Sequence, residues 1–205
     1  VKTSTKDGIL TIRMDRPDKK NALTLDMYSA MAKAITDADN DQNTRVIVIT
    51  GATDAFCAGN DLNDFMNNPP TSEKSPVLQF LRAISEAKMP VVAAVNGTAV
   101  GIGVTMLLHC DFVYVSETST LSLPFINLGL VPEAGSSMIL PLLAGHQKAS
   151  ELLMLGEPFT ANDAKEIGIV NEVCKADDVE KKAMETAKKL SEKPFFFSPD
   201  FSAFF

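Results

Sequence analysis

Residues 91–115, VVAAVNGTAVGIGVTMLLHCDFVYV, decide the fold. The segment opens with the apolar run 91–95, which is typical of a strand buried on both faces. A glycine-containing turn follows, then a short helix from about Gly103, then a second strand at 111–115. A buried strand that leads through a helix into another strand indicates an α/β fold.

The same alternation continues on both sides of this segment. Residues 8–14 alternate between apolar and polar side chains, which predicts a half-buried strand. The apolar run 45–50 predicts another fully buried strand. Further strands are expected at 120–123 and 169–173. Helices are expected after Thr24, from Pro76, at 135–144, at 147–155, between Thr160 and Gly168, and at 177–192.

We therefore expect one α/β domain over residues 1–192, followed by a Phe-rich C-terminal tail over residues 193–205. Half of the 12 Phe residues lie in the last eleven positions. An exposed cluster of this kind promotes aggregation unless something covers it. Two interpretations stay open: the tail packs on a neighbouring surface or core, or the C-terminus is altered or incomplete.

The composition sets limits on the class of protein. The chain has 205 residues, of which 45% are hydrophobic and 22% charged, which is typical of a globular domain. The net charge of −7 argues against non-specific nucleic-acid binding, but main-chain N–H groups are still able to hold an anionic ligand. No apolar run approaches the roughly 18 residues of a membrane span, and no secretory leader is visible. We expect a cytoplasmic protein, with the peroxisomal matrix as the alternative.

The cysteines and histidines give no sign of a metal site. Cys57, Cys110 and Cys174 are far apart and odd in number, which fits a reducing compartment rather than a disulfide framework. His109 and His146 lack a partner acid or nucleophile in a known motif, and we expect them to serve local packing or the surface.

Two loops carry the first chemical signal. Residues 55–62, AFCAGNDL, follow a buried strand, and alone they indicate only a tight turn. Residues 96–111, NGTAVGIGVTMLLHCD, join a strand to a helix but contain neither GxGxxG nor GxxxxGK[ST], so a dinucleotide site is not supported. Both loops offer main-chain N–H groups, and two such loops together suggest an oxyanion hole.

At this point the chain resembles a known family. The order RPDKKNAL, FCAGNDL, VNGTAVGIG…CD and PFINLGLVPEAG resembles the crotonase superfamily, also called the enoyl-CoA hydratase/isomerase family, from residue 8 to about 190. The resemblance implies an α/β spiral of ββα units and a CoA thioester substrate. It also implies C-terminal helices that complete a homotrimer. In place of these helices, this sequence shows only the Phe-rich tail.

The resemblance also assigns site residues. The thioester oxygen is expected between the main-chain N–H groups of Ala58 and Ile102. The segment expected to line the acyl-CoA site consists of Ala58, Gly59, Asn60, Asp61 and Leu62. Asp61 is also a candidate for turning its loop through side-chain to main-chain hydrogen bonds. Lys19 and Lys20 are expected either to meet the CoA phosphates or to be a solvated surface pair.

The sequence departs from the hydratases at their two catalytic acids. Thr105 and Phe125 stand where the hydratases have glutamates, and neither side chain is able to pass the protons of a water molecule. One acid, Glu133 in GLVPEAG, stands where the peroxisomal-type Δ3,Δ2-enoyl-CoA isomerases have their single catalytic glutamate. The alternative for Glu133 is a surface carboxylate near a helix N-terminus. Phe125, Ile126 and Leu130 are candidates for an apolar pocket around it, or for plain core.

The expectation is therefore a Δ3,Δ2-enoyl-CoA isomerase of fatty acid β-oxidation that binds an acyl-CoA thioester and uses no metal and no redox cofactor. Glu133 is the expected acid/base. Two alternatives remain open, namely a hydratase or another crotonase reaction, and a non-catalytic acyl-CoA-binding module.

Overall fold

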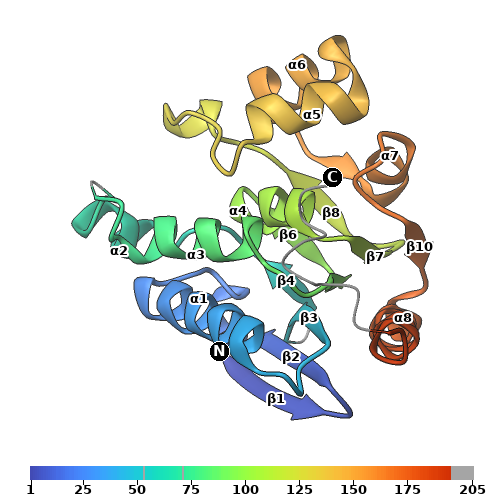
Figure 1. Ribbon diagram of the computed structural model, residues 1–205. Helices are drawn as coiled ribbons and strands as arrows, with labels where there is room; N and C mark the ends of the chain where they lie inside the picture. Colours follow the sequence, from blue (N-terminus) through green and yellow to red (C-terminus); the bar gives the residue numbers. More distant parts are fainter. Residues whose placement is uncertain (53, 71, 195–205) are drawn as a thin grey trace.

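The computed structural model describes residues 1–52, 54–70 and 72–194. Most of the predicted Phe-rich tail therefore lies outside the described residues. The fold is a mixed α/β structure with two sheets, as Figure 1 shows. The α/β prediction is confirmed.

The larger sheet has six strands. In spatial order they are β1 (Lys2–Lys6), β2 (Ile9–Met14), β3 (Val46–Gly51), β5 (Val91–Val95), β7 (Phe112–Ser116) and β10 (Glu172–Cys174). β1 pairs with β2 in an antiparallel ladder, and every other neighbouring pair is parallel. Parallel neighbours place the carboxyl ends of successive strands at one edge of the sheet.

The smaller sheet has four strands. In spatial order they are β4 (Ala55–Cys57), β6 (Thr98–Val100), β8 (Thr120–Ser122) and β9 (Phe159–Thr160). The first three run parallel to one another, and β9 is antiparallel to β8.

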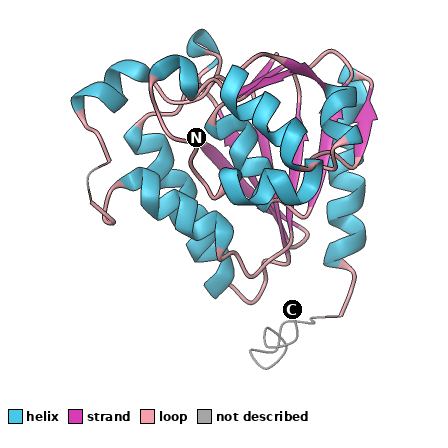
Figure 2. Cartoon of the chain, turned by 90° about the horizontal axis from the view of Figure 1, so that it is seen from above, coloured by secondary structure: helices cyan, strands magenta, loops and turns pink. Residues whose placement is uncertain are grey.

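Eight α-helices connect and cover the strands in the part of the chain that is described. They are α1 (Leu25–Asn40), α2 (Leu62–Asn67), α3 (Pro76–Ser85), α4 (Ile102–Thr105), α5 (Ser136–Ala144), α6 (His146–Leu155), α7 (Ala161–Glu166) and α8 (Val179–Ser191). Short 3-10 turns lie at η1 (Pro17–Lys19), η2 (Met106–His109), η3 (Ile126–Leu128) and η4 (Ala176–Asp178). Figure 2 shows helices on both sides of the strands. None of these helices is long and apolar enough to cross a membrane.

The fully apolar strands are explained by a core on each face of the larger sheet. Ile47 and Ile49 of β3 belong to the core under α1 and α3, whereas Val46 and Val48 of the same strand belong to the core under α8. Successive side chains of a strand point to opposite faces, so both faces of β3 must be apolar. Figure 1 shows α1 and α3 on one side of this sheet and α8 on the other.

Several predicted helix starts are confirmed by their capping bonds. The Thr24 side chain accepts from the N–H of Met27 at the start of α1. Thr160 forms a capping box with Asp163 at the start of α7, and α3 has Pro76 in its first turn. These contacts are local, which is why sequence alone locates them.

One predicted strand is wrong in its position. Residues 169–173 were expected to form it, but β10 begins only at Glu172. The N–H groups of Ile169 and Val170 both donate to the carbonyl of Ala164, at 3.0 and 3.2 Å. Because these donors close the end of α7, they are not available to a strand ladder, and the two apolar side chains are buried as part of a loop.

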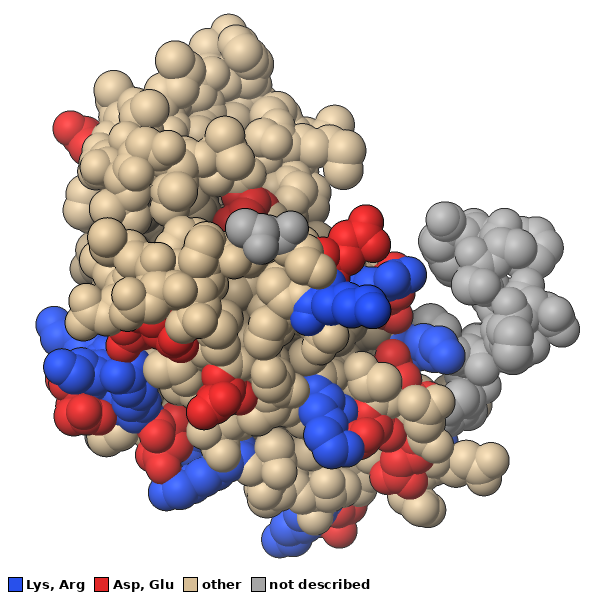
Figure 3. Space-filling view, turned by 90° about the vertical axis from the view of Figure 1, so that its left-hand side faces the viewer, with Lys and Arg blue, Asp and Glu red and all other residues tan. Residues whose placement is uncertain are grey.

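One side of the molecule has an exposed surface that is almost free of charge. Figure 3 shows few Lys, Arg, Asp or Glu side chains toward the top of the view, at the height of α5 and α6, and many below. The large apolar side chains exposed in this region are Ile126, Leu128, Leu130, Val131, Met138, Leu142, Leu143, Met154 and Leu155. Exposed apolar surface of this extent is typical of a region that another surface covers.

Candidate active site

Three loops leave the same edge of the smaller sheet. The parallel strands β4, β6 and β8 end at Cys57, Val100 and Ser122, so the segments that follow them start side by side. A cavity of about 300 Å³ lies between these segments. Its lining residues are Ala58, Gly59, Asn60, Leu62, Phe65, Val100, Gly101, Ile102, Pro124, Phe125, Asn127, Leu128 and Leu130. Ligands of parallel α/β proteins bind at this edge.

Two glycines set the distance between the first two loops. A Cβ atom on Gly103 would lie 2.6 Å from the carbonyl oxygen of Cys57, and one on Gly97 would lie 1.6 Å from that of Asp54. Neither distance is possible for a real side chain. The main chains of the two loops are therefore in direct contact, and no residue other than glycine fits at these points.

The segment RPDKKNAL holds the first loop from the other side. Asn21 is wholly buried, and its side-chain amide donates to the carbonyls of Ala52 at 3.1 Å and Ala55 at 2.6 Å. The guanidinium of Arg16 donates to the Asp61 carboxylate at 2.7 Å. From the sequence, only Lys19 and Lys20 of this motif are predicted to act at the site, whereas the two residues that shape the loop are Arg16 and Asn21.

The structure gives Ala58 a different partner from the predicted one. Its main-chain N–H donates to the carbonyl oxygen of Lys20 at 3.0 Å. An N–H group that is already bonded within the protein is not available to a thioester oxygen. Ala58 lines the cavity as predicted, but its expected role as a hydrogen-bond donor to the substrate is not supported.

Asn60 has the free N–H that Ala58 lacks. The Leu23 N–H donates to the Gly59 carbonyl, and the Asp61 N–H donates to the Leu23 carbonyl, both at 2.8 Å. In such a parallel bridge, the N–H of the residue between these two partners points away from Leu23. The Asn60 N–H takes part in none of the hydrogen bonds of the described residues, and Asn60 lines the cavity.

Ile102 provides the second N–H. It is the first residue of α4, and the first N–H groups of a helix have no partner within it. Ile102 lines the same cavity as Asn60. The predicted place of Ile102 at the site therefore agrees with the structure.

The Asn60 side chain is held by a buried tyrosine that sequence analysis did not identify. The hydroxyl of Tyr28, on α1, donates to Asn60 Oδ1 at 2.5 Å. Burial raises the pKa of Tyr28 well above 10, and the nearby Cys57 and Glu133 raise it further, so the hydroxyl stays protonated. Its ring packs against Phe80 with centroids 5.5 Å apart. A lone tyrosine on a helix gives no sequence signal for this contact.

Asp61 does not line the cavity, contrary to its place in the predicted substrate-binding segment. Its carboxylate accepts from Arg16 and from the N–H of Asp64, the latter at 3.1 Å, and so caps α2. These bonds hold the pKa of Asp61 below its ordinary value, with the Arg16 hydrogen bond as the largest cause. The predicted side-chain to main-chain contact is confirmed, and Asp61 shapes the loop.

Glu133 lies against the helix that starts at Ile102. The Thr105 hydroxyl donates to Glu133 Oε1 at 2.5 Å. Oε2 is buried and has no hydrogen-bond partner among the described residues. Burial raises the pKa of Glu133 to about 7, against the opposing effect of the Thr105 bond. A carboxyl group with such a pKa is typical of an acid/base that works near neutral pH.

The predicted apolar surroundings are present only in part. Phe125 and Leu130 line the cavity, whereas Ile126 is 52% exposed and faces solvent. Glu133 itself is not among the lining residues of the cavity. It belongs to the site through Thr105, which follows Ile102 by one turn of helix.

The raised pKa of Glu133 predicts a pH-dependent stability. The folded pKa of about 7 lies above the ordinary 4.5, so the folded state binds more protons between these values. The contribution of Glu133 to the free energy of unfolding is therefore fully present below about pH 4.5 and is lost as the pH rises through 7. The total loss is at most about 3 kcal/mol. Urea unfolding of the parent and of Glu133→Gln at pH 5 and pH 8 measures the effect. Glu133→Gln removes this titration, so equal pH dependence of the unfolding free energy in the two proteins would contradict the assignment.

Cys57, which precedes the cavity-lining segment, is not activated. Burial raises the pKa of Cys57 to about 12, so its thiol stays protonated. The side chains of Lys19 and Lys20 are exposed. No group of three or more His, Cys, Asp or Glu side chains suited to a metal ion occurs in residues 1–52, 54–70 and 72–194.

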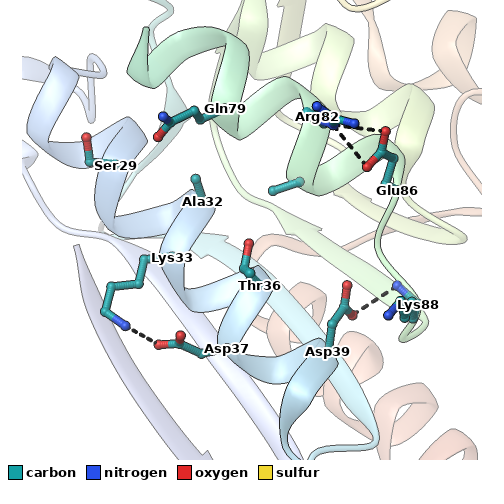
Figure 4. Close-up of a pocket in the computed structure, with 11 residues that line it drawn as sticks. Ser29, Ala32, Lys33, Thr36, Asp37, Asp39, Gln79, Arg82, Glu86 and Lys88 are labelled. Atoms are coloured by element: carbon teal, nitrogen blue, oxygen red, sulfur yellow. Dashed lines mark hydrogen bonds and ion pairs between the residues drawn. The ribbon is translucent and has the colours of Figure 1, made fainter. Parts of the chain in front are cut away.

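A second hollow of about 480 Å³ lies between α1 and α3. Figure 4 shows that its charged side chains pair with one another: Lys33 with Asp37 and Arg82 with Glu86. Asp39 accepts from the main-chain N–H of Lys88. Exposed, mutually paired charges of this kind are typical of a solvated surface, so the candidate site remains the cavity beside Asn60 and Ile102.

Comparison with known proteins identifies the family to which the chain belongs. The model of the Enoyl-CoA hydratase/isomerase family matches residues 4–199, and the chain belongs to this family. The resemblance inferred from the motifs is therefore confirmed.

The relatives carry several activities in their names. Enoyl-CoA delta isomerase 2 of Rattus norvegicus is 36% identical over 197 residues, which are 93% of this chain and 50% of the rat protein. A mitochondrial enoyl-CoA hydratase of Pongo abelii is 31% identical over 181 residues, 88% of this chain and 62% of that protein. This chain thus spans about half of the rat protein and less than two thirds of the hydratase.

The fold is shared with solved structures. The structure of Pseudomonas aeruginosa OdaA is 47% identical and superposes with a TM-score of 0.92, covering 94% of this chain and 78% of that one. Family and fold are thus established together, whereas the names of the relatives do not select one reaction.

Proposed function

We propose that this chain carries the active site of a Δ3,Δ2-enoyl-CoA isomerase, which moves the double bond of a 3-enoyl-CoA to the 2-trans position in fatty acid β-oxidation. The observation that carries the proposal is the state of Glu133. One carboxyl oxygen is fixed by Thr105, the other is buried with no hydrogen-bond partner among the described residues, and the pKa is about 7. A group of this kind is suited to take up and return one proton.

The reaction needs one base and a place for negative charge. Glu133 removes a proton from C2 of the 3-enoyl thioester, and the electron pair spreads over C2, C4 and the thioester oxygen. Glu133 then returns the proton to C4, so the double bond lies between C2 and C3 and no atom is gained or lost. Because the proton and the electrons balance, we propose that no metal or redox cofactor takes part.

We propose that the main-chain N–H groups of Asn60 and Ile102 bind the thioester oxygen. This pair replaces the predicted pair of Ala58 and Ile102, since the Ala58 N–H already donates to Lys20. Asn60 and Ile102 line the same cavity, and neither N–H has another acceptor among the described residues. Preorganised donors of this kind stabilise the charge that develops in the transition state.

Hydration is the second reaction that the family name suggests. It requires groups that orient a water molecule and pass its protons to and from the substrate. Among the described residues, no Asp or Glu lines the cavity, and the one acid joined to the site, through its bond from Thr105, is Glu133. The hydratases have acids at the positions of Thr105 and Phe125. Here Thr105 supplies a hydroxyl that donates to Glu133, and Phe125 supplies an apolar ring. These features favour isomerisation.

A direct comparison of substrates tests the proposal. With 3-enoyl-CoA we expect the absorbance of the conjugated thioester to appear, and dialysis against a chelator should leave the rate unchanged. With 2-enoyl-CoA, kcat/KM for hydration should be less than about one hundredth of the value for isomerisation, because general acid–base groups contribute about 10²–10⁴. Comparable values would favour the hydratase, and binding without turnover would favour an acyl-CoA-binding module.

We also propose that the whole protein is a homotrimer. The exposed apolar side chains of α5, α6 and the segment 126–131 support self-association. Light scattering on the full-length protein gives the mass of the assembly, and a monomer at micromolar concentration would contradict this proposal.

A further inference from the structure

The turn that carries Glu133 has an unusual backbone. Glu133 is followed by Ala134 with φ 53° and Gly135 with φ 65°, and α5 begins directly after them. Glycine adopts these left-handed conformations freely, but a residue with a Cβ atom rarely does. Ala134 therefore depends on contacts from its surroundings to keep this conformation.

Two hydrogen bonds from one neighbouring segment hold the turn. The first is the Thr105 bond to Glu133 Oε1. The second joins His109 Nε2 to the carbonyl oxygen of Ala134 at 2.8 Å. Since a carbonyl oxygen only accepts, the hydrogen is on Nε2, and both neutral and charged imidazole are able to donate from this atom. Thr105 and His109 are four residues apart in α4 and η2, the segment that also begins with Ile102.

The turn is closed from its own side as well. The main-chain N–H and the hydroxyl of Ser136 both donate to the Glu133 carbonyl oxygen, at 3.0 and 2.6 Å. The main-chain bond closes a β-turn in which Ala134 and Gly135 are the two central residues, so it helps to hold both of them in the left-handed conformation. The bond from His109 adds a contact from a neighbouring segment to the carbonyl oxygen of Ala134 itself.

We propose that His109 is a positioning residue for Glu133: by holding the Ala134 carbonyl, it keeps the strained turn in place and so keeps Oε2 aimed away from Thr105. The inference rests on the proposed function, in which Glu133 is the base. Sequence analysis assigned His109 to packing or to the surface, and a packing role would not depend on a hydrogen-bond donor.

The first test compares three single substitutions on 3-enoyl-CoA. His109→Ala removes the donor, and we expect kcat to fall about 10- to 100-fold with KM within about threefold, because small displacements of a reacting group cost this much. His109→Gln retains an N–H donor at a similar distance and should return kcat to within about threefold of the parent. His146→Ala, at an exposed histidine outside the site, is the control. Parent-like kcat in folded His109→Ala would overturn the inference.

The second test uses the strain at Ala134. Glycine adopts the left-handed conformation without cost. With glycine in place of Ala134, the turn should therefore persist even without the hydrogen bond from His109. We expect kcat of the double variant His109→Ala, Ala134→Gly to exceed that of His109→Ala by at least about fivefold. A double variant that is no faster than His109→Ala would show that His109 does not act by holding this turn.

A third measurement separates this inference from the proposed function. With ¹³C-labelled glutamate, the Glu133 carboxyl resonance, assigned by its loss in Glu133→Gln, should titrate near 7 in the parent. In His109→Ala it should titrate closer to an ordinary carboxyl, because the relaxed turn exposes the group. This readout requires no turnover. If the parent fails to isomerise 3-enoyl-CoA, the proposed function is wrong, but the titration still decides whether His109 holds Glu133. If the titration of Glu133 is the same in His109→Ala as in the parent, the inference about His109 is wrong and the proposed function is not affected.

Discussion

Replacement of Glu133 by Gln is expected to lower kcat for 3-enoyl-CoA by about 10²–10⁴ while the fold stays intact. The substituted amide keeps nearly the same shape, and its oxygen is still able to accept from Thr105, so the turn should not move. What the amide lacks is the ability to take a proton from C2. Steady-state kinetics, with circular dichroism and substrate binding as checks of the fold, measure the effect.

The control is Glu157→Gln, a substitution of the same type at an exposed glutamate outside the cavity, which should leave kcat unchanged. In the parent, kcat/KM should rise with pH through about 7, because the base of the free enzyme must be deprotonated to act. If Glu133→Gln kept more than about a tenth of the parent activity, the base would be another residue, and the proposed reaction would lose its main support.

Removal of the Asn60 N–H should cost about 10²–10³ in kcat, the typical effect of losing one donor to an oxyanion. The cleanest change replaces the amide by an ester, with an α-hydroxy acid incorporated in place of Asn60. The ester lacks the N–H donor, but it keeps the Asn60 side chain and the hydrogen bond that this side chain accepts from Tyr28. Because the Asn60 N–H has no acceptor among the described residues, unfolding free energy should change little.

The same change at Ala58 is the matched control. There the ester removes the bond to the Lys20 carbonyl, so it should lower the unfolding free energy by about 1 kcal/mol and reduce kcat less than tenfold. Ile102→Ala, which leaves the main chain intact, should also affect kcat only mildly. A larger loss of kcat at Ala58 than at Asn60 would restore Ala58 as the donor and would show that the Lys20 contact opens on substrate binding.

The parts of the fold that sequence predicts are those with local causes. Thr24 and Pro76 mark helix starts because their effects act within one turn, and the apolar runs of β3 and β5 reflect burial on two faces. The strand β1 escaped prediction because its five residues are all exposed and its pairing with β2 uses main-chain groups. Its sequence, KTSTK, carries no hydrophobic pattern.

The candidate site could be predicted in its composition but not in its hydrogen bonds. Motif order predicted Ala58 and Ile102 as the donors and Asn60 only as a lining residue, and all three line one cavity in the structure. Which N–H group is free depends on Lys20, which precedes Ala58 by 38 positions and meets it only in the folded chain. In the same way, Tyr28 and His109 act through contacts with distant loops that no spacing in the sequence reveals.

The contact between Gly103 and the Cys57 carbonyl divides the cavity into a part that tolerates sequence change and a part that does not. Any side chain at Gly103 would push apart the two loops that carry the N–H groups of Asn60 and Ile102, so this position requires glycine. Pro124, Leu128 and Leu130 also line the cavity, but they do so with their side chains, and Leu128 is 52% exposed. We therefore expect substitutions of these side chains to change the shape of the cavity, while the main chain around Asn60 and Ile102 keeps its geometry.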